Sequence, residues 1–278
     1  TWEVASLGEA NNQVTGGVSR VRGTGDTAGG PVPWSVVLKV CRDSSEAGAG
    51  DVHAPQFWRR EYLAYASGLL DDLPPGVRAP HCHGAEERPD GTAWLWLEDL
   101  GDDDRSPWPL ERYGLAARHA GQSNGAYLCG RPIPDVPWLC EGLASDWAET
   151  FGRPIERLDE LRDHPLVRRQ WPDARAAERF VRLWRERELY LSALTRLPRT
   201  LCYLDLFKRN LFAVLGPDGC DETVAVDWAF VGTAAVGEEL APLVCASVAL
   251  TDADPDRVRE LGESCFAGYL AGLRDAGW

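Results

Sequence analysis

Methionine is absent from the 278-residue sequence, and lysine is nearly absent. Position 1 is a threonine, so we expect the sequence to begin inside its gene product. Of the 29 lysine and arginine residues, only Lys39 and Lys208 are lysine. Each lysine therefore departs from the basic residue that this chain normally uses, and each is a candidate for a specific role.

Long hydrophobic runs are missing as well. No stretch approaches the roughly 18 to 20 apolar residues of a membrane span, and the first residues lack the pattern of a signal peptide. These absences predict a protein that has no membrane partner and resides in the cytoplasm.

Paired cysteines are also missing. The eight cysteines form no Cys-x-x-Cys pair and several lie in apolar runs, so we expect buried thiols in a reducing compartment. His81 and His83 flank Cys82, which is part of a zinc-binding pattern. Because no second group of ligands completes a tetrahedral site, a surface turn after Pro80 is the favoured interpretation.

Basic residues are outnumbered, and the net charge is −14. This balance argues against a nucleic-acid partner, because binding to a phosphate backbone requires a basic face. Residues 201–278 carry 13 acidic and 5 basic side chains, which would suit a cationic ligand but is explained equally by a solvated surface. With 44% hydrophobic residues, the chain is long enough for one large domain or two lobes.

The first hundred residues are dominated by strand patterns. Alternating and β-branched segments predict an antiparallel meander, followed by one helix and one further strand. In order, these elements are expected at 2–7, 14–23, 33–42, 54–73 and 91–101.

Helices dominate after residue 110. Apolar residues at helical spacing predict helices at 111–128, 173–197 and 254–273. A β-hairpin is predicted across 200–232, with its turn at 216–219. The order predicts an α+β, two-lobed chain with a small β-rich lobe at 1–99, a larger mainly helical lobe carrying the hairpin at 100–278, and a ligand-binding cleft between them.

Polar residues interrupt the apolar frame of that hairpin. Asp205 and Asn210 lie five residues apart in "LCYLDLFKRNLF", and the second strand delivers Asp227 in "AVDWAF". A hairpin can bring all three together, and their oxygens suit Mg²⁺, with one aspartate left to orient or accept a hydroxyl proton. The alternative is an Asx-capped turn without chemistry.

A second group of candidates lies in the N-terminal part. Lys39 ends the strand "SVVLK", and Glu61 follows on the next helix. A strand lysine paired with a helix glutamate is how kinases hold the phosphates of ATP. Gly16 and Gly17 would let backbone N–H groups approach phosphate. The alternatives are a solubilising edge-strand lysine, an exposed glutamate and an ordinary turn.

Taken together, Lys39, Glu61, "YLDLFKRN" and "VDW" followed by "GEEL" resemble the aminoglycoside phosphotransferase and choline kinase-like family, which has the protein-kinase-like fold. The resemblance covers nearly the whole chain. It implies that Asp205 is the catalytic base, that Asn210 and Asp227 bind Mg²⁺, and that Lys39 and Glu61 bind phosphates of ATP or GTP. Further nucleotide contacts are implied at Thr15, Gly16, Gly17, Leu97, Glu98 and Leu100.

The chain departs from the family pattern at two positions. Tyr203 stands where the family usually has histidine, and Glu238 and Glu239 stand where it usually has aspartate. Ala-Pro-Glu and Phe-Gly motifs are missing, which argues against a protein kinase that is regulated through an activation segment.

The resemblance implies transfer of a γ-phosphoryl group to the hydroxyl of a small molecule: an aminoglycoside-like compound, a sugar or an amino alcohol. We expect the acceptor to lie near residues 137–147 ("PWLCEGLASDW"), Trp228, Glu239 and Arg209. Two alternatives stay open: a nucleotide-binding pseudokinase that docks a protein partner, and a kinase that acts on a peptide hydroxyl.

Overall fold

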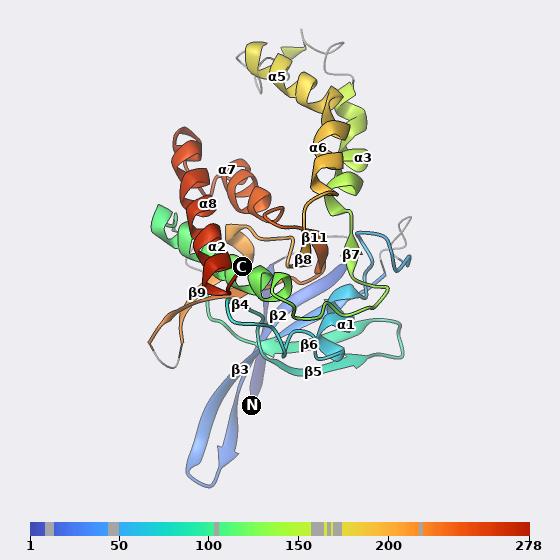
Figure 1. Ribbon diagram of the computed structural model, residues 1–278. Coiled ribbons are helices and arrows are strands. Elements are labelled where there is room, and N and C mark those ends of the chain that lie inside the picture. Colours follow the sequence, from blue (N-terminus) through green and yellow to red (C-terminus); the bar gives the residue numbers. More distant parts are fainter. Residues whose placement is uncertain are drawn as a thin grey trace.

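A computed structural model describes most of the chain. The described residues are 1–8, 14–43, 50–102, 106–156, 164–165, 168, 174–216 and 219–278. The protein has the predicted α+β architecture with two lobes: a β-sheet with one short helix forms one end, and a larger, mainly helical part forms the other (Figure 1).

The N-terminal lobe is built on a five-stranded antiparallel sheet, in the order β1-β2-β3-β6-β5. The predicted meander is confirmed as β1, β2 and β3, and the predicted strand at 91–101 as the shorter β6. Residues 81–84 were expected as a surface turn, but residues 82–84 form the first half of β5. The strands are β1 (Trp2–Gly8), β2 (Thr15–Thr27), β3 (Gly30–Cys41), β5 (Cys82–Glu87) and β6 (Ala93–Glu98).

The helix of this lobe is shorter than predicted. The pattern indicated 54–73, whereas α1 spans Arg60–Ala66 and is preceded by turns. The carbonyls of Ala54 and Pro55 accept hydrogen bonds from the guanidinium of Arg60, and the carbonyl of Ala54 also accepts the N–H of Phe57 in a turn, so neither carbonyl has a donor four residues later as in an α-helix. The start of the helix is therefore set by a contact that apolar spacing does not report.

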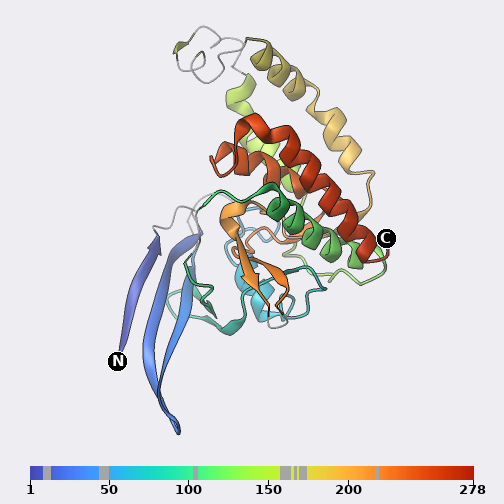
Figure 2. The same ribbon diagram turned by 90° about the vertical axis from the view of Figure 1, so that its left-hand side faces the viewer.

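Two long helices form the centre of the C-terminal lobe: α2 (Leu110–Leu128) and α8 (Val258–Asp275). Both predictions are confirmed, including the helix with three internal glycines. A Cβ at Gly121 would lie 2.3 Å from the carbonyl oxygen of Tyr269, and one at Gly272 would lie 1.9 Å from that of Arg118. The glycines lower the intrinsic stability of each helix but allow the two backbones to touch. Figure 2 shows α2 and α8 side by side.

The hairpin predicted at 200–232 is confirmed only for the strand segments next to its turn. β9 (Leu211–Leu215) and β10 (Asp221–Ala225) are antiparallel, and β4 (Val77–Arg78) joins β10 in parallel. The first half forms a separate strand, β8 (Arg199–Cys202), in another small sheet. Residues 203–210 therefore form a loop between two sheets. The second sheet is completed by β7 (Cys140–Glu141) and β11 (Gly232–Ala235).

A helical arm extends from the C-terminal lobe (Figure 1). The helix predicted at 173–197 is broken at Glu186 into two, and their apolar face is only half-buried. The arm contains α3 (Leu143–Glu156), α5 (Ala174–Arg185) and α6 (Arg187–Leu194). Short helical turns at Lys208–Asn210, Pro242–Ala246, Ser247–Ala249 (α7) and Pro255–Arg257 complete the described elements.

One hydrophobic cluster runs through both lobes, from Leu95 of β6 to Leu206 of the loop and Leu261 of α8. The described cysteines form no disulfide with one another, and not all are buried as expected, since Cys129, Cys220 and Cys245 are exposed. Within the described residues, no helix combines the length and apolarity that crossing a membrane would require.

Candidate active site

Lys39 is the centre of a buried ion cluster. Its Nζ lies 2.5 Å from Oε2 of Glu61 and 2.8 Å from Oδ1 of Asp227. The lysine comes from β3, the glutamate from α1, and the aspartate from the connection between β10 and β11. Both lobes thus contribute to one cluster, and the structure brings together three of the residues that the sequence analysis selected.

The charge of Lys39 is maintained by its partners. Burial by itself lowers the pKa of the ammonium group, but Asp227 and Glu61 more than offset this effect and raise the pKa above its usual range. Lys39 is therefore a buried cation at neutral pH, and its ammonium group has a third N–H that could reach a further anion such as a phosphate.

Asp205 and Asn210 face each other across the loop that precedes β9. Asn210 Nδ2 donates to Oδ2 of Asp205 over 2.7 Å. Burial, followed by repulsion from Asp227, raises the pKa of Asp205 to about 7. A carboxyl group with a pKa near the working pH is well suited to accept a proton.

The backbone beside the cluster is held in an uncommon conformation. Leu204 has a φ angle of 70° and Asp227 has a φ angle of 64°. Residues other than glycine rarely adopt this left-handed region of backbone conformation. Glu239 accepts from the N–H groups of Tyr203 and Leu204, at 2.9 and 3.4 Å. On the other side, the N–H of Trp228 donates to Glu61 over 3.2 Å. Buried hydrogen bonds thus hold both strained positions.

Tyr203 connects the loop to the segment that carries Asp227. Its hydroxyl donates to the carbonyl of Val226, and its ring packs edge-on against Trp228 at 4.7 Å between centroids. The N–H of Val226 in turn donates to the carbonyl of Asn210 over 2.9 Å. Tyrosine at this position therefore ties the two segments together.

The side chains of the three residues expected beside an acceptor have other partners. Glu239 is 2% exposed, and its carboxylate accepts hydrogen bonds from the backbone of the loop. Trp228 is 3% exposed, and its indole N–H donates to the carbonyl of Ala225. The guanidinium of Arg209 pairs with Asp252 and with the carbonyl of Leu250. This expectation is corrected because sequence position alone does not tell on which side of a loop a side chain lies.

The expected phosphate-binding residues lie alongside Lys39. Thr15, Gly16 and Gly17 begin β2 at an irregularity of its pairing with β3, after which Val18 pairs with Lys39 itself. Thr15 is buried. Residues 9–13, the first part of the expected glycine loop, lie outside the described residues.

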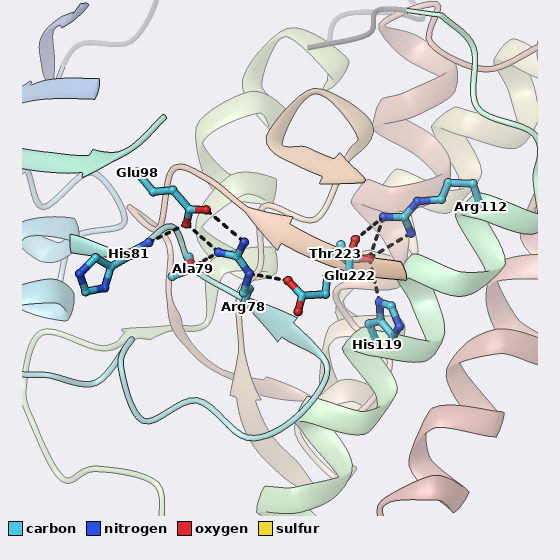
Figure 3. A network of polar contacts seen from close by, with 8 residues as sticks. All are labelled: Arg78, Ala79, His81, Glu98, Arg112, His119, Glu222 and Thr223. Atoms are coloured by element: carbon cyan, nitrogen blue, oxygen red, sulfur yellow. Dashed lines mark hydrogen bonds and ion pairs between the residues drawn. The ribbon is translucent and has the colours of Figure 1, made fainter. Parts of the chain in front are cut away.

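At the end of β6, where a nucleotide base was expected, Leu97 is buried, Leu100 is half-buried, and the side chain of Glu98 has other partners. Its carboxylate accepts from Arg78 over 2.7 Å and from the N–H of His81 over 3.0 Å. Figure 3 shows Arg78 between Glu98 and Glu222 of β10, which lies 2.8 Å from its Nε. Glu98 thus contributes to a network between the lobes.

The same network continues into α2. Arg112 donates to the hydroxyl of Thr223 over 3.0 Å, and Nδ1 of His119 lies 2.9 Å from that hydroxyl (Figure 3). Both Nη atoms of Arg112 donate to this hydroxyl and occupy its two acceptor positions, which leaves the hydroxyl proton of Thr223 for Nδ1 of His119. Burial lowers the pKa of His119, in agreement with a neutral ring.

Arg20 fixes the segment that follows β6, and sequence reasoning missed it. Its Nε lies 2.8 Å from Asp99, and its two Nη atoms reach Asp102 at 2.5 Å and the carbonyl of Gly101 at 2.6 Å. In a chain that uses arginine for nearly all of its positive charge, no local pattern marks this arginine as buried.

The donor set of the cluster fits a hard cation. Glu61 and Asp227 contact the ammonium group of Lys39, and repulsion from Asp227 contributes to the raised pKa of Asp205, so acidic side chains outnumber the one cation of the cluster. No group of three or more His, Cys, Asp or Glu that could hold a metal occurs among the described residues. Asn210 and Asp227 offer amide and carboxylate oxygens, which are the ligand types that Mg²⁺ uses together with phosphates and water.

Comparison with known proteins supports the fold. No protein-family model matches the chain, and no curated protein sequence matches it significantly. Solved structures do. An amicoumacin kinase in complex with AMP-PNP and Ca²⁺ aligns with a TM-score of 0.52 at 15% identity, over 98% of this chain and 72% of that one.

Two further structures align in the same way. A microcompartment-associated aminopropanol kinase has a TM-score of 0.52 at 18% identity, over 97% of this chain and 75% of that one. The GDP complex of an aminoglycoside 2′-phosphotransferase has a TM-score of 0.50 at 14% identity, over 98% and 80%. The chain thus has the fold of these small-molecule kinases.

Proposed function

We propose that this protein transfers the γ-phosphoryl group of ATP or GTP to a hydroxyl group of a small molecule. The observation that carries the proposal is the buried Lys39, paired with Glu61 and Asp227 across the two lobes, in a fold that several small-molecule kinases share. In this proposal residues 1–99 bind the nucleotide, and residues 100–278 supply the catalytic loop and the acceptor site.

Each residue of the cluster has a defined task. Lys39 holds the α- and β-phosphates, together with backbone N–H groups of Thr15, Gly16 and Gly17. The backbone of residues 97–100 receives the base. Asn210 and Asp227 hold Mg²⁺, which supplies neutralisation of the phosphate charge when it is bound.

Asp205 is the base of the proposed reaction. Its carboxylate orients the acceptor hydroxyl and takes its proton while the acceptor oxygen bonds to the γ-phosphorus. The bond from that phosphorus to the bridging oxygen breaks, and the nucleoside diphosphate leaves. The pKa of Asp205, raised to about 7 by burial and by Asp227, suits this role near neutral pH.

The acceptor site is proposed beside α3. Trp147 of this helix is 43% exposed, and its ring lies 6.1 Å from that of Phe230, three residues after Asp227. These rings replace Trp228, Glu239 and Arg209 as candidate contacts with the acceptor.

An active enzyme is favoured over a pseudokinase because Tyr203 holds the catalytic loop and the segment of Asp227 together.

Nucleotide binding provides the first test. The Kd for ATP and GTP is measured by titration with and without Mg²⁺, for the wild type, Asp227→Ala and Asp205→Ala. We expect Mg²⁺-dependent binding by the wild type, loss of that dependence in Asp227→Ala, and an affinity within about twofold of wild type in Asp205→Ala, because a base that faces the acceptor does not hold the nucleotide. Wild-type protein that binds neither nucleotide would refute the proposal.

A further inference from the structure

Arg60 is a fully buried cation at the start of α1, with 0% of its surface exposed. Among the described residues, the hydrogen-bond partners of its guanidinium are four backbone carbonyls. Nε reaches Trp138 at 2.6 Å, one Nη reaches Pro55 at 2.6 Å and Ala229 at 3.0 Å, and the other reaches Ala54 at 2.7 Å. One side chain therefore joins three segments that are far apart in the sequence.

Simple packing does not explain a cation at this position. No described carboxylate forms an ion pair with Arg60, and burial lowers its pKa. Burying a charge without a countercharge is unfavourable, and an apolar side chain of similar volume is often neutral or more stabilising. What an apolar side chain lacks is the rigid fork of donors that can reach several carbonyls at once.

The acceptors of Arg60 lie next to the ion cluster. Arg60 bonds to the carbonyl of Ala229, while Glu61, its neighbour, accepts the N–H of Trp228 and pairs with Lys39. Two consecutive residues of α1 thus attach the helix to two consecutive residues that follow Asp227. The bond to Trp138 adds a second attachment in the C-terminal lobe.

We propose that Arg60 is a positioning residue that latches α1 to the segment after Asp227 and so keeps Lys39, Glu61 and Asp227 assembled before nucleotide binds. Its importance for phosphoryl transfer rests on the proposed function, whereas the latch itself is a property of the nucleotide-free protein. The assembled cluster then needs neither a partner nor a modification to form.

Hydrogen–deuterium exchange of the nucleotide-free protein tests the latch directly. Arg60→Lys keeps the charge but replaces the fork with a single nitrogen. Arg59→Lys is the matched control, because Arg59 is half-exposed and pairs with Glu87 at the surface. We expect exchange in α1 and at the amide of Trp228 to be about tenfold faster or more in Arg60→Lys, with other regions and the Arg59→Lys control unchanged.

Nucleotide affinity separates positioning from general stability. We expect Arg60→Lys and Glu61→Gln each to raise the Kd for Mg²⁺–ATP by about tenfold. The double variant should bind no more weakly than the weaker single variant, because both changes act through the same attachment of α1 to the segment after Asp227. Losses that multiply in the double variant, or α1 exchange equal to wild type in Arg60→Lys, would overturn the latch.

The experiments remain decisive if the Arg60→Lys variant fails to fold or if the wild type binds no nucleotide. If Arg60→Lys does not fold, exchange of the wild type over a denaturant series decides: the latch predicts that α1 and the Trp228 amide open together with the global unfolding step, and separate early opening of α1 contradicts it. If the wild type binds no nucleotide, the proposed function fails, while the exchange result in the nucleotide-free protein still decides the latch.

Discussion

At the scale of single residues, the site depends on buried hydrogen bonds that hold an uncommon backbone. The hydroxyl of Tyr203 and the carboxylate of Glu239 both form hydrogen bonds that hold the loop carrying Asp205, and both side chains are buried. Their removal should therefore affect stability as well as chemistry.

Tyr203→Phe removes the donor to the carbonyl of Val226 and leaves that buried acceptor unpaired. We expect the free energy of unfolding to fall by about 1–3 kcal/mol, as measured by denaturant titration. Tyr190→Phe is the control, since Tyr190 is 49% exposed on α6, and its effect should stay within about 0.5 kcal/mol. Equal stabilities of the two variants would show that the bond to Val226 contributes nothing.

Glu239→Gln should change how stability depends on pH. Burial raises the pKa of Glu239 from 4.5 to about 7, so between these values the folded state keeps a proton that the unfolded state has released. Stability should fall as pH rises through this window, with a slope of about 1.4 kcal/mol per pH unit from this group, and should level off above pH 7. In Glu239→Gln this part of the slope should vanish. A difference between wild type and variant that is constant from pH 4.5 to pH 7 would contradict this reasoning.

At the scale of elements, the C-terminal lobe rests on the close approach of α2 and α8. Gly121→Ala would place a methyl group 2.3 Å from the carbonyl oxygen of Tyr269, a distance that only a shift of the helices can relieve. We expect a loss of about 1–3 kcal/mol or more in the free energy of unfolding.

The control for this variant lies on α8. A Cβ at Gly262 would meet nothing within 4 Å, so Gly262→Ala should be neutral or stabilise by up to about 1 kcal/mol. Thermal unfolding of both variants compares the two sites. A loss at Gly262 as large as that at Gly121 would mean that helix contact does not determine the effect.

At the scale of the whole molecule, the sequence predicted the order of elements and the cluster better than it predicted what supports them. Lys39 was conspicuous because lysine is rare, and Asp205, Asn210 and Asp227 interrupt apolar frames. The sequence predicted that these side chains lie close together, although the first arm of the predicted hairpin is divided into two strands, β8 and β9. The prediction succeeded because both strands flank the loop that carries Asp205.

The supporting residues could not be predicted for physical reasons. Arg60 and Arg20 bind mainly to backbone carbonyls or to carboxylates some 80 residues away, and such contacts leave no local pattern among many arginines. The start of α1 was misplaced for the same reason. The sequence shows that Glu239 and Trp228 follow the catalytic loop along the chain, and for that reason they were expected beside the acceptor. It does not show on which side of the loop their side chains lie, and both are buried.

Following the γ-phosphoryl group itself tests the central claim most directly. The protein is incubated with Mg²⁺, γ-labelled ATP or GTP, and a panel of aminoglycosides, sugars and amino alcohols, and the label on each acceptor is measured for wild type and Asp205→Ala. The account predicts label on an acceptor hydroxyl with the wild type, and a rate about 100-fold to 10,000-fold lower with Asp205→Ala at nearly unchanged nucleotide affinity. Transfer by Asp205→Ala at the wild-type rate would contradict it.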